Sequence, residues 1–342
     1  MLRGVGGVAS FLPNILILFL GIAVMEDTGY MARAAFIMDR FMHRIGLHGK
    51  SFIPMLIGFG CSVPAIMATR ILENKRDRIT TIMIIPLMSC GARLTIYSLV
   101  IPAFFPSHWQ APVLWMIYVF GIVLAAVLAK VLRVFVLKGE GEGLVMELPP
   151  YRMPTLRSAL IHMALRGRMY LQKAGTVILA FSVILWALTT YPRAPRQITA
   201  KIADPAQRKS VELQYAAIGR LGRAVEPGIR PLGFDWRIGT ALAAALPAKE
   251  MFVAQMGIVL SVGEHTDHRE PVLRDQLRRA YSPLTGLCVL IFCLVSAPCL
   301  TTIAVTRRET NSWFWAAAQF FGLTALGYLL TLIVFQTGSR FF

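Results

Sequence analysis

The dominant pattern along the chain is a series of long apolar runs separated by shorter polar stretches. A helix that crosses a membrane needs about 20 mostly apolar residues, and eight runs come close to that length. They lie at residues 8–26, 52–70, 79–105, 112–136, 171–191, 237–260, 283–305 and 313–336. Tryptophan and tyrosine lie near several run ends, as they do at membrane interfaces. The pattern predicts an all-α fold, a polytopic integral membrane helical bundle.

The eight runs form two groups of four on either side of a polar stretch. We expect a first membrane half at residues 1–136, a polar cytoplasmic connector at 137–170 and a second membrane half at 171–342. The second half contains polar loops at 192–236 and 262–282.

Four of the runs are interrupted by proline: Pro64, Pro86, Pro247 and Pro298. Glycine or serine lies close to three of them, and Lys249 and Glu250 follow Pro247. Proline removes a backbone donor and frees carbonyl groups, which the membrane interior tolerates only inside protein or beside a wet cavity. The breaks also pair between the halves, residues 63–65 with 246–248 and 89–91 with 298–300. Interrupted segments at corresponding places of two halves indicate the central site of a transporter.

Composition and charge support a membrane protein. Hydrophobic residues make up 56% of the chain and charged residues 15%, which excludes a disordered chain. Lys and Arg number 35 against 18 Asp and Glu, a formal net charge of +17. Basic residues between apolar runs are typical of cytoplasmic membrane loops, so we expect the lipid bilayer, and not nucleic acid, as partner.

The charge pattern fits a simple topology only in part. The basic loop at 70–78 should be cytoplasmic. Alternation through eight full crossings then places several arginines on the opposite side: Arg33, Arg40, Arg44, Arg307 and Arg308. Either the charge rule fails there or some broken segments are re-entrant. Four crossings in each half give parallel repeats, whereas re-entry gives the odd count that inverted repeats need.

The five cysteines divide into two kinds. Cys288 and Cys293 lie in an ordinary apolar run and are expected to be core residues. Cys61, Cys90 and Cys299 each lie beside glycine or proline at a break, where sulfur could contact a passing transition metal. There is no CxxC pair, so a closed structural zinc site is not indicated.

Charged residues inside the runs are a second candidate feature, because they are costly in a membrane and usually functional. Lys249 and Glu250 are adjacent in the broken run at 237–260, and Arg93 follows Cys90. For Lys249 and Glu250, the structural interpretation is an internal ion pair that holds the break together, and this role is compatible with a gating role.

The string Gly49-Lys50-Ser51 imitates the end of a phosphate-binding loop. The first glycine of that motif would be position 44, which is Arg44. We therefore predict no GTP site in these residues and no enzymatic activity for the chain.

Several motifs resemble those of one known family. They are Glu26-Asp-Thr-Gly-Tyr-Met-Ala-Arg33, Gly58-Phe-Gly-Cys61-Ser-Val-Pro-Ala65, Ala68-Thr-Arg70, Met88-Ser-Cys90-Gly-Ala-Arg93 and Pro247-Ala-Lys-Glu250. With them, nearly the whole chain resembles the membrane domain of the ferrous iron transport protein B family, whose members contain two Gate regions.

This resemblance implies passage of Fe(II) between the two Gate-like halves. It implies that Cys61 and Cys90 in the first half and Cys299 in the second contact the metal. Glu250 is a weaker candidate, as an acidic contact. Fe2+ is then the transported substrate, with no permanently bound cofactor, and the expected location is the cell inner membrane.

The chain also departs from that family, whose members begin with a cytoplasmic G domain and a helical spacer. This sequence starts where a third membrane helix is expected, so either it is truncated or the G domain is a separate polypeptide. The expected partners are therefore a separately encoded G domain, a small cytoplasmic accessory protein of the same iron transport system, and further copies of the chain.

Two other functions remain open from the sequence. A Gate-type transporter of a polar organic solute, such as a nucleoside, would use the same broken helices without needing cysteine. A non-transporting membrane scaffold or assembly factor would move no solute and would tolerate changes at Lys249 and Glu250.

Overall fold

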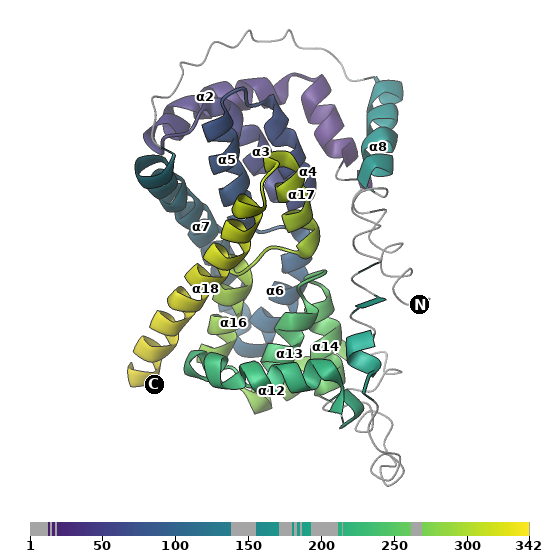
Figure 1. The fold of residues 1–342 in the computed structure, drawn as a ribbon, viewed down its shortest axis with the longest axis vertical. Coiled ribbons are helices and arrows are strands. Elements are labelled where there is room, and N and C mark those ends of the chain that lie inside the picture. The colour runs from purple at the N-terminus through teal and green to yellow at the C-terminus, as the bar shows by residue number, and fades with distance from the viewer. Residues whose placement is uncertain are drawn as a thin grey trace. The chain divides into compact units, whose positions relative to one another are not determined.

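The fold was analysed in a computed structural model, which describes residues 13, 16–17, 19–137, 155–170, 180, 183–184, 187–192, 211–213, 215–260 and 269–341. The regular structure in these ranges is helical, without a β-strand (Figure 1). The prediction of an all-α fold is confirmed for this part of the chain.

The described part of the first half consists of short helices followed by a broken long helix and a continuous one. These elements are α2 (Tyr30–Arg44), η1 (Gly49–Ser51), α3 (Phe52–Gly58), α4 (Ser62–Ala68), η2 (Thr69–Ile71), α5 (Lys75–Ile84), η3 (Ile85–Leu87), α6 (Gly91–Phe104), α7 (Ser107–Val131) and η4 (Leu132–Val136). The connector contributes α8 (Leu156–Tyr170).

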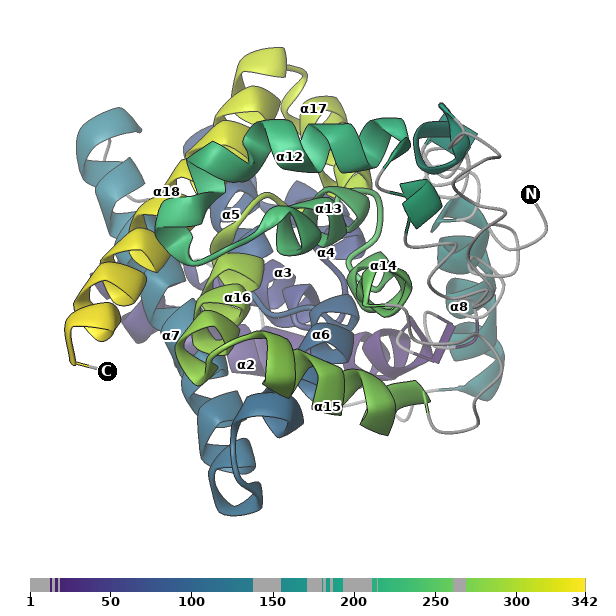
Figure 2. The ribbon, with the colours of Figure 1, turned by 90° about the horizontal axis from the view of Figure 1, so that it is seen from below.

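The second half repeats this order and adds one helix, α15 (Figure 2). Its elements are α12 (Ala217–Ile229), η6 (Arg230–Leu232), α13 (Trp236–Ala244), α14 (Met251–Val259), α15 (Arg269–Ala280), α16 (Pro283–Val295), α17 (Leu300–Thr310) and α18 (Trp313–Phe341). By position, α2 corresponds to α12, the pair α3–α4 to α13–α14, the broken helix α5–α6 to α16–α17, and α7 to α18.

Polar side chains just outside the apolar runs fix where several helices begin. The Asn74 side chain accepts a hydrogen bond from the Arg76 N–H at the start of α5, 2.9 Å. Asp235 caps α13 through the Ile238 N–H, 3.0 Å, and Ser282 caps α16 through the Thr285 N–H, 3.2 Å. Such caps satisfy N–H groups that have no partner inside the helix.

Four helices in the described ranges are long and apolar enough to cross a membrane, as expected for a helical membrane protein. They are Lys75–Phe104, Ser107–Val136, Pro283–Thr310 and Trp313–Arg340. They match the predicted runs at 79–105, 112–136, 283–305 and 313–336. Of the other predicted runs, residues 19–27 of the first are helical, and most of 171–191 lies outside the described residues.

The helices group into two compact units, and each unit contains parts of both halves. One consists of residues 1–91, 120–180 and 301–319, so that α2–α5 lie together with α17. The other consists of residues 92–119, 181–300 and 320–342, so that α12–α16 lie together with α6. Each broken helix therefore contributes its two parts to different units.

The run at 52–70 folds as a hairpin of two short helices, α3 and α4, which fits the re-entrant alternative that the sequence left open. Lys50, just before α3, forms a 3.3 Å ion pair with Glu73, just after η2. The chain therefore enters through α3, turns at residues 59–61 and returns through α4 to the end where it started. The hydropathy of the run is the same for a crossing and for a hairpin, which is why the sequence pattern did not separate them.

The run at 237–260 turns back in the same way. Ile238 at the start of α13 and Met256 near the end of α14 line one small cavity, which requires α14 to run back beside α13. The Tyr281 hydroxyl, just before α16, donates hydrogen bonds of 3.0 Å to both Asp235 carboxylate oxygens. Burial, and then the neighbouring Asp235 carboxylate, raise the pKa of Tyr281, so its hydroxyl remains a donor.

Contacts within each unit join the end of one broken helix to the start of the other. In the first unit, Glu309 at the end of α17 bonds to Arg78 at the start of α5, 2.7 Å. In the second, Phe104 at the end of α6 and Gly286 at the start of α16 line the same cavity.

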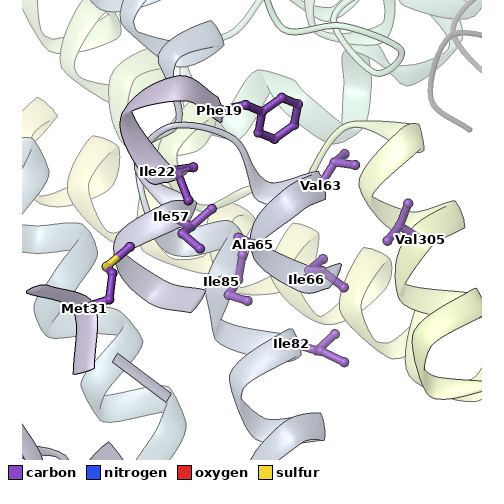
Figure 3. Close-up of a cluster of buried hydrophobic side chains, with 10 residues drawn as sticks. All are labelled: Phe19, Ile22, Met31, Ile57, Val63, Ala65, Ile66, Ile82, Ile85 and Val305. Atoms are coloured by element: carbon purple, nitrogen blue, oxygen red, sulfur yellow. The ribbon is translucent and has the colours of Figure 1, made fainter. Parts of the chain in front are cut away.

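A cluster of buried apolar side chains joins the first hairpin to its neighbours. Figure 3 shows its members, which come from residues 19–27, α2, α3, α4, α5, η3 and α17. They are Phe19, Ile22, Met31, Ile57, Val63, Ala65, Ile66, Ile82, Ile85 and Val305. Small and branched side chains let the short helices approach closely, which is the main source of helix association within membranes.

Gln319 fills a gap that Pro86 leaves in the first broken helix. The Ile82 carbonyl would accept a hydrogen bond from residue 86 in a regular helix, but proline has no N–H to donate. The Gln319 side chain donates to this carbonyl instead, 2.8 Å, and accepts from the Thr306 hydroxyl, 2.8 Å. All three side chains are fully buried, so this contact satisfies polar groups that water cannot reach.

Two carboxylates fix the helix ends of the first unit. Glu309, whose side chain is 3% exposed, accepts hydrogen bonds from Arg70 at 2.8 and 2.6 Å and from Arg78 at 2.7 Å. Asp77 and Arg133, also buried, form a 3.2 Å ion pair between the start of α5 and the end of α7. Residues 307–308 therefore lie at the same end as residues 70–78, and simple alternation, which separates them, is wrong.

The Glu309→Gln variant should lose about 1–3 kcal/mol of unfolding free energy, because a buried amide cannot compensate two guanidinium groups. Equilibrium denaturation in mixed micelles measures this loss. Asp275→Asn is the matched control, since the Asp275–Arg279 pair is 57% and 80% exposed and should contribute less than about 0.5 kcal/mol. Equal losses of unfolding free energy in the two variants would contradict a structural role for the contacts of Glu309 with Arg70 and Arg78.

Candidate functional site

Cys61 lies at the tip of the first hairpin, in the turn that separates α3 from α4. Its backbone is extended, with φ −155° and ψ 131°, so the two short helices do not join into one. The side chain is half-buried and packs against the apolar cluster. The break that the sequence predicts from Gly58, Gly60 and Pro64 is therefore present, with a cysteine at its end.

Cys90 lies at the break of the first long helix, immediately before Gly91, where α6 begins. The Gly91 N–H donates a 3.1 Å hydrogen bond to the Gly60 carbonyl at the hairpin tip. Cys61 and Cys90 are thus the direct chain neighbours of two bonded residues. The structure brings the two predicted residues of the first half into one region, and both thiols are half-buried.

The close approach of these two breaks depends on the lack of a side chain at Gly58. A Cβ at this position would lie 3.2 Å from the Met88 Cβ, which is tighter than ordinary van der Waals contact. Glycine at position 58 therefore allows the hairpin to reach the break beside Cys90.

The second unit is built in the same way around Cys299. This half-buried residue ends the break between α16 and α17, and the next residue, Leu300, donates a 2.9 Å hydrogen bond to the Leu246 carbonyl. Leu246 begins the turn between α13 and α14, and this turn ends at Glu250, also half-buried. Cys299 and the turn that contains Glu250 are therefore held together within this unit.

The two backbone contacts define how the halves correspond. In each, the first residue of a half-helix donates to a carbonyl at the tip of the hairpin. This pairs Cys90 with Cys299, as predicted from the sequence. It also pairs Cys61 with Pro247 and Pro64 with Glu250, three residues away from the predicted match of 63–65 with 246–248. Pro64 lies in the first turn of α4, where a missing N–H costs nothing, so the two prolines are not equivalent.

The remaining candidates are placed more simply. Cys288 and Cys293 are buried in α16, as expected for core residues. Lys249 and Arg93 are also buried. Gly49-Lys50-Ser51 forms η1, where the Gly49 N–H binds Asp39, 2.8 Å, and Lys50 binds Glu73, so these residues have structural roles.

Within the described ranges, no group of three or more His, Cys, Asp or Glu side chains is arranged to hold a metal ion. The candidates instead form two sets, described separately for the two units: Cys61 with Cys90, and Cys299 with Glu250. Sequence reasoning missed Gln319, although Pro86 gives the signal for it, because a proline inside an apolar run implies an unpaired carbonyl four residues earlier.

Comparison with known proteins gives two matching family models. Residues 8–104 and 171–313 match the Gate model, described as "Nucleoside recognition", and residues 114–166 match a model described as "Ferrous iron transport protein B C terminus". The two Gate matches contain the two hairpins and the two broken helices. No solved structure matches the chain.

Similar proteins cover the chain almost completely. It is 41% identical to a Fe(2+) transport protein A/Fe(2+) transporter FeoB fusion protein of Porphyromonas gingivalis, over 100% of this chain and 44% of that protein. It is 40% identical to the Fe(2+) transporter FeoB of Campylobacter jejuni, over 97% of this chain and 54% of that protein. It is 38% identical to the Fe(2+) transporter FeoB of Staphylococcus aureus, over 100% of this chain and 48% of that protein. The chain spans about half the length of the curated relatives it matches, and the predicted resemblance is confirmed.

Substitution of Gly58 by valine should separate the hairpin tip from the break beside Cys90. We expect a loss of about 1–3 kcal/mol from overpacking against Met88 and faster maleimide modification of Cys61 and Cys90. Mass spectrometry of the modified peptides gives the rate at each thiol. Gly257→Val is the control, because a Cβ at Gly257 meets no atom within 4 Å. Unchanged thiol reactivity in Gly58→Val would show that the contact does not position the cysteines.

Proposed function

The chain belongs to the Gate family, and from this premise we propose that it is the membrane-permease portion of a ferrous iron transporter of the cell inner membrane. Fe2+ is the transported substrate. The observation that carries this proposal is the placement of half-buried cysteines at the broken helices of both halves, in a chain whose relatives are named Fe(2+) transporters.

The candidate residues offer a mixed set of ligands for an ion that moves. Thiols suit soft transition metals, whereas carboxylate and carbonyl oxygens suit harder ions. In this proposal Fe2+ contacts Cys61 and Cys90 in one unit and Cys299 and Glu250 in the other, together with carbonyls near the breaks. Few ligands at each step keep binding weak enough for release, which conduction through a membrane protein requires.

Charge gives the orientation that we propose for the protein. Arg70, Lys75 and Arg78 lie at one end of the first unit, and Glu309 brings Arg307 and Arg308 to that same end. Positively charged residues near the ends of spans favour the cytoplasm. This end is therefore cytoplasmic in the proposed topology, and both hairpins are re-entrant.

Neither alternative function gains support from the relatives. All three proteins compared above are named for Fe2+ transport, and none is named for a nucleoside or for assembly. Because the matched relatives are about twice as long as this chain, we further propose that a G domain works together with this permease.

The triple variant Cys61→Ser/Cys90→Ser/Cys299→Ser should reduce Fe2+ uptake at least about tenfold, a loss that removal of even a supporting group can cause at a metal site. The assay follows quenching of an iron-sensitive dye inside proteoliposomes that contain the full chain. Binding of Co2+ provides a second readout, since a thiolate–cobalt charge-transfer band should be present in the parent and absent from the variant.

Cys288→Ala is the matched control, because this side chain is buried in α16 and lies eleven residues before Cys299. It should keep the cobalt band and the uptake of the parent once folding is verified. Parental uptake by the serine variant would show that the cysteines do not carry iron, and Glu250→Gln would then test the acidic contact alone.

A further inference from the structure

Helix α2 carries three arginines that the proposed iron path does not use. Its buried face consists of Met31, Ala35 and Met42. Arg33, Arg40 and Arg44 follow one another at spacings of seven and four residues, which places them in one stripe along the helix. They form a continuous basic stripe away from the buried face.

A second exposed stripe of α2 is apolar. Tyr30, Ile37 and Phe41 have the same spacing of seven and four residues, and they are 55%, 75% and 48% exposed. Each lies one position after or three positions before an arginine of the basic stripe, so the two stripes are adjacent. An exposed apolar stripe beside a basic stripe indicates a surface that binds a partner with both apolar and negatively charged groups.

The structure places α2 at the level where membrane spans begin and end. Asp39 of α2 accepts a hydrogen bond from Gly49, and the next residue, Lys50, pairs with Glu73 just before α5. Gly46, two residues after α2, packs against Arg133 at the end of the α7 span. A Cβ atom placed on Gly46 would lie 3.3 Å from the Cβ of Arg133. Figure 1 shows α2 crossing the end of α5 instead of running along it.

The charges of Arg40 and Arg44 are available to a partner outside the helix, whereas the Arg33 guanidinium donates a 3.2 Å hydrogen bond to the Gly29 carbonyl. Asp39 is the only acidic residue of α2, and its carboxylate is occupied by the Gly49 N–H at 2.8 Å and by His43 at 3.3 Å. Arg40 and Arg44 are exposed. A helix at the membrane boundary, with an apolar stripe and arginines beside it, has the pattern that binds anionic lipid surfaces.

We propose that α2 is an interfacial helix that binds anionic phospholipid. Tyr30, Ile37 and Phe41 enter the boundary between headgroups and acyl chains. Arg40 and Arg44, both exposed, contact the phosphate groups of the same leaflet. This interaction is independent of the iron path, so it holds whatever solute the protein moves.

The position of the apolar stripe is tested with a photoreactive benzoylphenylalanine in place of Ile37, in the full chain reconstituted into vesicles of phosphatidylcholine and phosphatidylglycerol. Mass spectrometry should find a lipid adduct. The same substitution at Met42, on the buried face, should crosslink only within the chain. A crosslink from position 37 to a second copy of the chain, or to no lipid at all, overturns the proposal.

The basic stripe is tested with Arg40→Gln/Arg44→Gln, which leaves Arg33 in place. Each arginine near an anionic surface contributes roughly fivefold in affinity, so the preference for phosphatidylglycerol over phosphatidylcholine, measured by native mass spectrometry, should fall about thirtyfold. Arg278→Gln/Arg279→Gln removes the same charge from the last turn of α15 and should change the preference less than twofold. An equal fall in both variants, or none in the first, overturns the proposal.

Discussion

The two backbone hydrogen bonds between hairpin tips and helix breaks are the contacts on which the rest of the fold depends. A break inside an apolar layer leaves N–H and C=O groups that water cannot satisfy, and each such group costs several kcal/mol. Gly91 bonds to Gly60, and Leu300 bonds to Leu246. Each of these hydrogen bonds needs a carbonyl from a hairpin tip and an N–H from a helix break at the same place. Each hairpin tip therefore lies beside one broken helix. Gln319 follows the same rule with a side chain, since it satisfies the Ile82 carbonyl that Pro86 cannot.

This constraint also explains why cysteine can be accommodated beside the breaks. Around each contact the backbone groups already have hydrogen-bond partners. The neighbouring residues, Cys61, Cys90 and Cys299, therefore lie where helical packing is interrupted, and all three are half-buried. A thiol is small, tolerates an apolar surrounding and still offers a lone pair to a metal. A larger polar side chain would need additional hydrogen bonds at the same place. The breaks therefore favour sulfur for physical reasons, independently of the identity of the ion.

The sequence predicted the places of the breaks but not the direction of the chain through them. Pro64, Pro86, Pro247 and Pro298 each lie at or beside an interruption, because loss of an N–H is a local property of one residue. The reversal at residues 59–61 is visible only in contacts between residues far apart in the sequence, Lys50 with Glu73 and residue 60 with residue 91, and such contacts leave no periodic signal. The same limit produced the shift of three residues in the match between the halves, since a proline is tolerated both in a break and in the first turn of a helix.

The contacts of Glu309 give the charge distribution of the first unit a physical basis. They bring the end of α17 to the start of α5, so Arg307 and Arg308 join Arg70, Lys75 and Arg78 at one end, with the Glu309 carboxylate as a counter-charge. The arginines of α2 lie near this same end, because Asp39 and Gly46 fix that helix to the starts and ends of spans. An excess of positive charge concentrated at one membrane boundary repels itself unless an anionic surface faces it. The arginines at this end of the first unit are thus suited to an anionic surface, whereas the buried charges of Arg93 and Lys249 lie beside the breaks.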